Sequence, residues 1–168
     1  NTMSAYMTGH KSAINALGVY VGRSTDNLNH PKQETLGELI KRKTNKSVGV
    51  VTDSEIQDAT PAAVVSHTRR RADKDKITGM FFDVKPDVIL GCGSAYFLPQ
   101  SVPGSKRKDD LNYVEMFKDD GYKLVTSNTE LTSIAKDTKQ LLGLFHTGNL
   151  DTVLDRRFLT ENGVTKQF

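Results

Sequence analysis

The chain has 168 residues, of which 36% are hydrophobic and 26% are charged, and its net charge is +3. This length is enough for one domain with a buried core, since a domain of about 150 residues buries about 70% of its unfolded surface. The weak charge gives no support to nucleic-acid or anionic-membrane binding. No run of about 18 apolar residues predicts a membrane span, and the single cysteine, Cys92, excludes an intrachain disulfide.

The first half of the chain predicts two helices and two short strands. We expect a helix over Thr2–Asn15, a strand over Gly18–Gly22, a polar loop over Thr25–Pro31, a helix over Thr35–Lys43 and a strand over Ser47–Thr52. The spacing of Leu36, Leu39 and Ile40 places these three side chains on one face of the second helix.

The junction after the second strand is the most informative stretch. A short β-branched run over Val48–Val51 is too brief for a helix, and the polar residues Thr52–Ser54 predict a loop. Thr60 fits an N-cap and Pro61 the first helical position, where its missing N–H costs nothing. Polar residues at such a junction lie at the carboxyl end of a strand, where open α/β sheets bind ligands.

The second half continues the alternation of strands and helices. We expect strands over Val88–Gly91, Tyr122–Val125 and Leu141–Phe145, helices over Asn112–Asp119 and Asn128–Lys136, and a polar tail over Thr160–Phe168. This pattern predicts a single α/β domain over residues 1–168, with a mainly parallel sheet and helices on both faces. Residues 99–110, PQSVPGSKRKDD, predict a mobile surface loop.

Two motifs resemble the alkaline phosphatase family. The first is DATPAA at residues 58–63, followed by His67 and Arg71, and the second is MSAYMTGHK at residues 3–11, followed by LGV at residues 17–19. The resemblance implies that Asp58 and Thr60 bind Mg²⁺ and that Arg71, thirteen positions after Asp58, clamps the substrate phosphate. A carboxylate and a hydroxyl are hard oxygen donors suited to Mg²⁺, and a guanidinium can bind two phosphate oxygens at once.

The resemblance further implies a phosphomonoesterase that works through a phosphoserine intermediate with two zinc ions. It places the nucleophilic serine about two positions before Asn1 and the zinc ligands after Phe168, so we expect an internal fragment that is inactive alone. The parent protein would act on phosphate monoesters as a homodimer, in the periplasm or outside the cell.

Other interpretations remain open. Gly91–Ala95 half-matches the dinucleotide-binding pattern, which leaves a nucleotide- or phosphate-binding domain without catalysis as the alternative, although a tight loop explains the glycines as well. For Arg69 and Arg70 we favour a solvated helix terminus, and for His67 a supporting position on a helix face rather than a zinc ligand. Asp58 alone could end a turn, and Cys92 fits a buried structural thiol.

Overall fold

The computed structural model describes residues 2–134 and 136–161. Its centre is a four-stranded sheet formed by β1 (Gly49–Glu55), β2 (Val88–Cys92), β3 (Lys123–Val125) and β4 (Leu141–Leu144). The strand order is β1-β2-β4-β3, and every neighbouring pair is parallel. The prediction of four parallel strands in one sheet is therefore confirmed.

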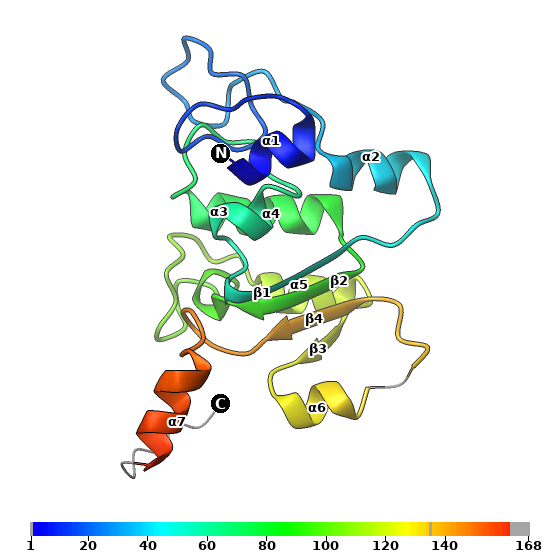
Figure 1. Cartoon of the computed structure of the whole chain (residues 1–168), viewed down its shortest axis with the longest axis vertical. Coiled ribbons are helices and arrows are strands. Elements are labelled where there is room, and N and C mark those ends of the chain that lie inside the picture. Colours follow the sequence, from blue (N-terminus) through cyan, green and yellow to red (C-terminus); the bar gives the residue numbers. More distant parts are fainter. Residues whose placement is uncertain (1, 135, 162–168) are drawn as a thin grey trace.

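Helices lie on both faces of this sheet (Figure 1). They are α1 (Thr2–Thr8), α2 (Leu36–Lys43), α3 (Ala59–Ala62), α4 (Lys74–Val84), α5 (Tyr113–Asp119), α6 (Asn128–Thr132) and α7 (Val153–Glu161), with a short 3-10 helix at Ser94–Tyr96. Along the sheet, the chain runs from β1 to its neighbour β2 and then to β3 at the far edge. It returns to β4, which lies between β2 and β3. Crossovers of one hand consequently place α3 and α4 on one face and α6 on the other.

The main core fills the space between the sheet and helices α4 and α5. Val50, Ile89 and Leu142 are in register on neighbouring strands and are buried together. Phe81 of α4 and Phe117 of α5 are fully buried against them. Edge-on aromatic contacts extend this packing, because the Phe117 ring lies 4.8 Å from that of Tyr122 and 5.1 Å from that of Phe82, at interplanar angles of 81° and 89°.

The first predicted helix is shorter than expected. Helix α1 ends at Thr8, and the prediction that it continues to Asn15 is wrong. Gly9 and Asn15 both have positive φ, at 72° and 65°, which a right-handed helix cannot accommodate. The segment between them is a loop.

The predicted strand at Gly18–Gly22 is also wrong. This part of the chain forms only isolated antiparallel bridges, Leu17 with Thr68 and Val19 with Lys32. Leu17 and Val19 are buried, whereas Tyr20 and Val21 are 47% and 43% exposed. The apolar run is therefore a partly buried loop that does not belong to the sheet.

The predicted helix over Thr35–Lys43 is confirmed, since α2 spans Leu36–Lys43 and Thr35 is its N-cap. The Thr35 hydroxyl accepts from the Glu38 backbone N–H at 3.2 Å, and the Glu38 carboxylate accepts from the Thr35 N–H at 2.8 Å. This capping box satisfies two backbone donors that the first turn leaves open.

Three other boundaries differ from expectation. The predicted loop at Thr52–Ser54 is wrong, because β1 continues to Glu55 through a register shift after Val51. Helix α6 ends at Thr132 instead of Lys136. Helix α7 overlaps the start of the predicted polar tail at Thr160, while residues 162–168 of that tail lie outside the described residues.

Strand β1 lies at one end of the strand order. In the described part of the chain no strand pairs with its outer side, and the Val51 side chain is 72% exposed. β1 is therefore an edge strand of the described sheet.

Close packing explains the glycines after β2. Gly93 has φ 83°, and a Cβ atom there would lie 2.4 Å from Oε1 of buried Gln57. The residue precedes a three-residue 3-10 helix instead of the long helix that a dinucleotide site requires. These contacts favour the tight-loop interpretation of Gly91–Ala95. Cys92 is buried, and this burial raises the pKa of its thiol.

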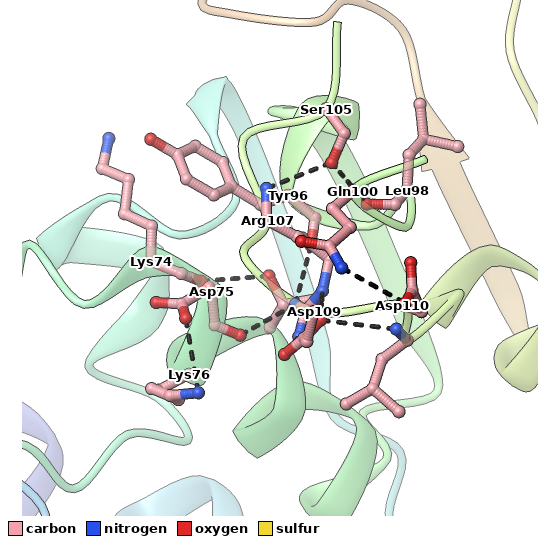
Figure 2. Close-up of polar contacts among 12 residues, drawn as sticks. Lys74, Asp75, Lys76, Tyr96, Leu98, Gln100, Ser105, Arg107, Asp109 and Asp110 are labelled. Carbon is pink, nitrogen blue, oxygen red and sulfur yellow. Dashed lines mark hydrogen bonds and ion pairs between the residues drawn. The ribbon is translucent and has the colours of Figure 1, made fainter. Parts of the chain in front are cut away.

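The loop over residues 99–110 is anchored to α4 by Arg107 (Figure 2). The Arg107 side chain is only 1% exposed and donates to both carboxylate oxygens of Asp109 at 2.7 Å. It also donates to the backbone carbonyls of Asp75 at 3.0 Å and Tyr96 at 3.1 Å, and its guanidinium lies 4.6 Å from the centre of the Tyr113 ring. Mobility of this loop stays a prediction, and these contacts argue against it.

Replacing Arg107 tests that anchor. We expect Arg107→Ala to lower the free energy of unfolding by about 3 kcal/mol, because a buried, charge-assisted set of hydrogen bonds is lost. Limited proteolysis should then cut within residues 99–110. The exposed neighbour Lys108 provides the control, since Lys108→Ala removes a charge without a buried contact. Rapid cleavage of the unaltered loop would instead confirm its mobility.

Acid should weaken the same contact. Arg107 holds the pKa of Asp109 below its usual range by donating hydrogen bonds to the carboxylate. A lowered pKa contributes stability that is present above the ordinary value of about 3.9 and is lost as the pH falls through the folded-state value. Asp109→Asn should therefore be less stable than the unaltered protein at pH 7. Urea unfolding should show that the difference in free energy of unfolding between the two proteins narrows below about pH 4.

Candidate functional site

The turn after β1 positions Asp58 through a buried relay of hydrogen bonds. The side chain of Gln57 is fully buried, and its Nε2 donates to the Thr78 hydroxyl of α4 at 3.0 Å. That hydroxyl donates in turn to the Lys74 carbonyl at 3.1 Å. The relay ties the turn that carries Asp58 to the first turn of α4.

The helix that follows begins earlier than the sequence suggests. Its N-cap is Asp58 instead of Thr60, and the Asp58 side chain makes no capping hydrogen bond. Pro61 is the third helical residue rather than the first, which is still harmless because the first-turn N–H groups have no partner within the helix. Helix α3 ends at Ala62. Because the Asp58 carboxylate does not cap this helix, it can bind other groups.

That carboxylate binds a lysine. Lys74 Nζ donates to Asp58 Oδ1 at 2.7 Å and also contacts Oε2 of Glu55 at the end of β1. Lys106 Nζ lies 3.6 Å from the other Glu55 oxygen. Burial acts to lower the pKa of Lys74, but the hydrogen bonds to Asp58 and Glu55 outweigh it and raise that pKa. Two carboxylates and two ammonium groups thus form a neutral cluster.

Sequence reasoning missed three members of this cluster. Glu55 could have been found, since a polar residue at the carboxyl end of a strand is a typical ligand position. Lys74 lies in the charged run Asp73–Lys76, which is typical of a solvated surface, and Lys106 lies in a predicted loop. Nothing in their local sequence signals the pairing.

Thr60 lies on the exposed side of α3. It borders a shallow hollow of about 180 Å³ between α3 and β1, which Met3 of α1 and Val64 also line. Within the described residues, no contact joins the Thr60 hydroxyl to the Asp58 carboxylate. The structure therefore places these two predicted Mg²⁺ ligands on one short helix without showing a closed site.

Arg71 is exposed and has a fixed backbone. Its N–H donates to the Asn15 carbonyl at 2.7 Å, in the loop that follows α1. Asn15 lies between the two parts of the N-terminal motif, residues 3–11 and 17–19, so this contact ties the Arg71 segment to that region. A long side chain on an anchored backbone can reach a bound anion while its Cα stays in place.

Arg69 and Arg70 do not lie at a helix terminus, so that interpretation is wrong. Both lie in the loop between the Thr68 bridge and α4, where the Asp73 N–H donates to the Arg70 carbonyl at 3.1 Å. The Arg69 guanidinium donates to the Ile14 carbonyl at 3.0 Å, while Arg70 is exposed. Neither arginine needs a helix dipole to explain its position.

His67 is not on a helix face either, because α3 ends five residues before it. It is buried, with Nδ1 2.8 Å from the Gly18 carbonyl and Nε2 2.7 Å from a Glu38 carboxylate oxygen. A doubly protonated ring would donate to both acceptors. Burial acts to raise the pKa of Glu38, but hydrogen bonds from His67 and Thr35 outweigh it and lower that pKa. The supporting role holds, since His67 joins α2 to the N-terminal segment.

The donors present fit part of a magnesium site. Among residues 2–134 and 136–161, no group of three or more His, Cys, Asp and Glu side chains is arranged to hold a metal ion. Mg²⁺ keeps several waters and needs few protein ligands, so Asp58 and Thr60 suit it as a partial donor set. The Lys74 ammonium on Asp58 Oδ1 is the feature that a metal ion would have to accommodate.

Fold and site together define an α/β protein with oxygen donors and an exposed arginine shortly after its first sheet strand. The sequence profile of the family described as alkaline phosphatase matches residues 1–166. The chain belongs to the alkaline phosphatase family. In the described part of the chain, no helix has both the length and the apolar character to cross a membrane.

Several relatives are similar along most of the chain. Alkaline phosphatase 4 of Bacillus subtilis (strain 168) is 36% identical over 159 residues, which cover 91% of this chain and 30% of the relative. Alkaline phosphatase of Escherichia coli (strain K12) is 32% identical over 168 residues, covering 88% and 34%. The chain thus spans about a third of the length of the curated relatives it matches.

Solved structures agree on the fold. The crystal structure of Thermus thermophilus alkaline phosphatase matches with a TM-score of 0.79 at 26% identity, covering 94% of this chain and 30% of that one. A mutant of the TAB5 alkaline phosphatase, described as having Mg bound in its M3 site, matches with a TM-score of 0.71 at 21% identity, covering 92% and 40%.

Thr78→Val tests how much the hydrogen bonds from Gln57 to Thr78 and from Thr78 to Lys74 stabilise the protein. The change keeps the side-chain shape but removes the acceptor of the buried Gln57 amide, which leaves that donor unsatisfied. We expect the free energy of unfolding to fall by about 1–3 kcal/mol, as measured by urea denaturation. Thr129→Val, on the exposed surface of α6, is the matched control and should change stability little. Equal effects of the two changes would show that the relay contributes nothing.

Proposed function

We propose that the full-length protein containing this chain hydrolyses phosphate monoesters through a phosphoserine intermediate. The observation that supports this most strongly is the family match over residues 1–166, combined with the position of Asp58 directly after β1. Carboxyl ends of parallel strands are where open α/β sheets bind ligands. We assign the nucleophilic serine and the zinc ligands to the remainder of the full-length protein, and we expect the chain described here to hydrolyse no phosphate ester by itself.

In this proposal Arg71 binds the substrate. Its guanidinium donates to two phosphoryl oxygens and neutralises charge that develops on them, while its backbone remains fixed on Asn15. Holding the phosphate in one orientation lowers the entropic part of the barrier. Asp58 and Thr60 would hold a Mg²⁺ ion, which would supply positive charge to the site. Metal ions bound by the complete protein would supply activation of the serine and of the leaving oxygen.

The same family relationship supports two further proposals. The full-length protein acts as a homodimer, and it works in the periplasm or outside the cell.

Arg71→Ala tests the phosphate clamp in the full-length protein. We expect kcat/KM for an aryl phosphate to fall about ten- to a hundred-fold, equivalent to roughly 1.4–2.8 kcal/mol, because a bidentate charge-assisted contact is lost. Activity should survive because Arg71 positions the phosphate without taking part in bond making. Arg71→Lys should recover only part of the loss, since an ammonium keeps the charge without the fork.

Arg70→Ala is the matched control, because Arg70 is exposed and next in sequence. Arg69→Ala should also cost little, since it removes one surface hydrogen bond to Ile14. Steady-state kinetics and inhibition by inorganic phosphate at one ionic strength would compare all four variants. A damaging Arg69 or Arg70 change together with a silent Arg71→Ala would show that the site is wrongly assigned.

A further inference from the structure

The ammonium group of Lys74 occupies the position from which a cation would neutralise Asp58. It lies 2.7 Å from Asp58 Oδ1 and also contacts the Glu55 carboxylate. The two carboxylates come from the end of β1 and the start of α3, whereas the lysine comes from the first turn of α4. The side chains of Glu55 and Lys74 are only 9% and 21% exposed, so water screens this contact weakly.

Lys74 is held in this position from its backbone as well as from its charged end. Its carbonyl accepts a hydrogen bond from the Thr78 hydroxyl. The carbonyl of the next residue, Asp75, accepts a hydrogen bond from the Arg107 guanidinium. Figure 2 shows the Lys74 side chain extending alongside Tyr96, whose ring centre lies 5.9 Å from the ammonium. The orientation of Lys74 is therefore built into the packing of α4 and the loop 99–110.

We propose that Lys74 is a built-in counter-cation that competes with Mg²⁺ for Asp58 and so sets the affinity of the site for the metal. The proposal rests on the proposed function in one respect, namely that Asp58 is a Mg²⁺ ligand. Without metal, the ammonium keeps the two carboxylates from repelling each other. A divalent ion at Asp58 Oδ1 would meet a like charge at a few ångströms, which costs free energy unless the lysine withdraws.

Glu55 provides the place to which Lys74 withdraws. The ammonium already contacts Glu55, so metal binding at Asp58 breaks one of its two carboxylate contacts and leaves the other. Lys106, 3.6 Å from the second Glu55 oxygen, also helps to hold that carboxylate in place. Lys74 is in this sense a positioning residue that acts through Asp58 and not on the substrate.

The test compares Mg²⁺ binding to two lysine variants of the full-length protein, loaded with zinc and freed of magnesium. Lys74→Met keeps the aliphatic stem and removes the charge, whereas Lys76→Met removes a charge from the exposed lysine two residues on, which pairs with Asp75 at 3.4 Å. Calorimetric titration with MgCl2 should give a dissociation constant about ten-fold lower or more for Lys74→Met, because the competing charge is gone. Lys76→Met should match the unaltered protein, and Lys74→Arg should not gain affinity.

A second readout needs no variant. In unaltered protein carrying ¹³Cε-labelled lysine, saturating Mg²⁺ should shift the Lys74 signal and leave that of Lys76 in place. This measurement decides the matter if Lys74→Met does not fold.

Each failure has a distinct meaning. Unchanged or weaker Mg²⁺ binding by folded Lys74→Met, or Mg²⁺ binding that leaves the Lys74 signal unmoved, would overturn the competition while an active parent enzyme keeps the proposed function. Absence of Mg²⁺ binding from both proteins would remove the role of Asp58 and the competition with it. Absence of phosphatase activity from the unaltered, metal-loaded protein would instead contradict the proposed function.

Discussion

The buried hydrogen bond between Gln57 and Thr78 is the constraint on which the carboxyl end of the sheet depends. It fixes the turn after β1 to helix α4, and therefore fixes the separation between Asp58 and Lys74. Gly93 makes room for it, because any side chain there would collide with the Gln57 amide. Packing thus fixes the backbone positions from which the Asp58 and Lys74 side chains reach each other.

The sequence predicted the sheet because buried parallel strands need apolar side chains on both faces, and such runs are short and β-branched. It predicted α2 because Leu36, Leu39 and Ile40 recur at helical spacing. It failed at Gly18–Gly22, where the same apolar pattern belongs to a partly buried loop with single bridges. It also failed after Pro61, because the chain leaves α3 to join Thr68 to Leu17, a tertiary contact with no local signal.

The same difference between local sequence signals and tertiary contacts applies to the candidate site. Asp58, Thr60 and Arg71 could be singled out because together they resemble a motif of the alkaline phosphatase family that spans fourteen residues here, counting both ends. Lys74 and Arg107 could not, because their partners are set by how α4 meets the turn after β1 and the loop 99–110. Charged runs such as residues 105–110 are normally solvated, yet the Arg107 side chain is almost fully buried among acceptors from three segments. Burial of a charge is a tertiary property, visible only once every partner is placed.

The open side of β1 has a consequence for handling the chain on its own. The first part of this strand, with Val51 exposed, lies at an edge that no described strand covers, and it is a template for adding a further strand. The end of the strand is already occupied, because the Asp53 carbonyl accepts from the Leu150 N–H at 2.9 Å and the Glu55 N–H donates to Asn149 Oδ1 at 2.8 Å. In a concentrated sample of the separate chain, the same edge of another molecule offers hydrogen-bond partners for the unpaired backbone groups. Self-association by sheet extension then competes with any measurement made at high concentration, and a charged or proline substitution on that edge is the natural remedy.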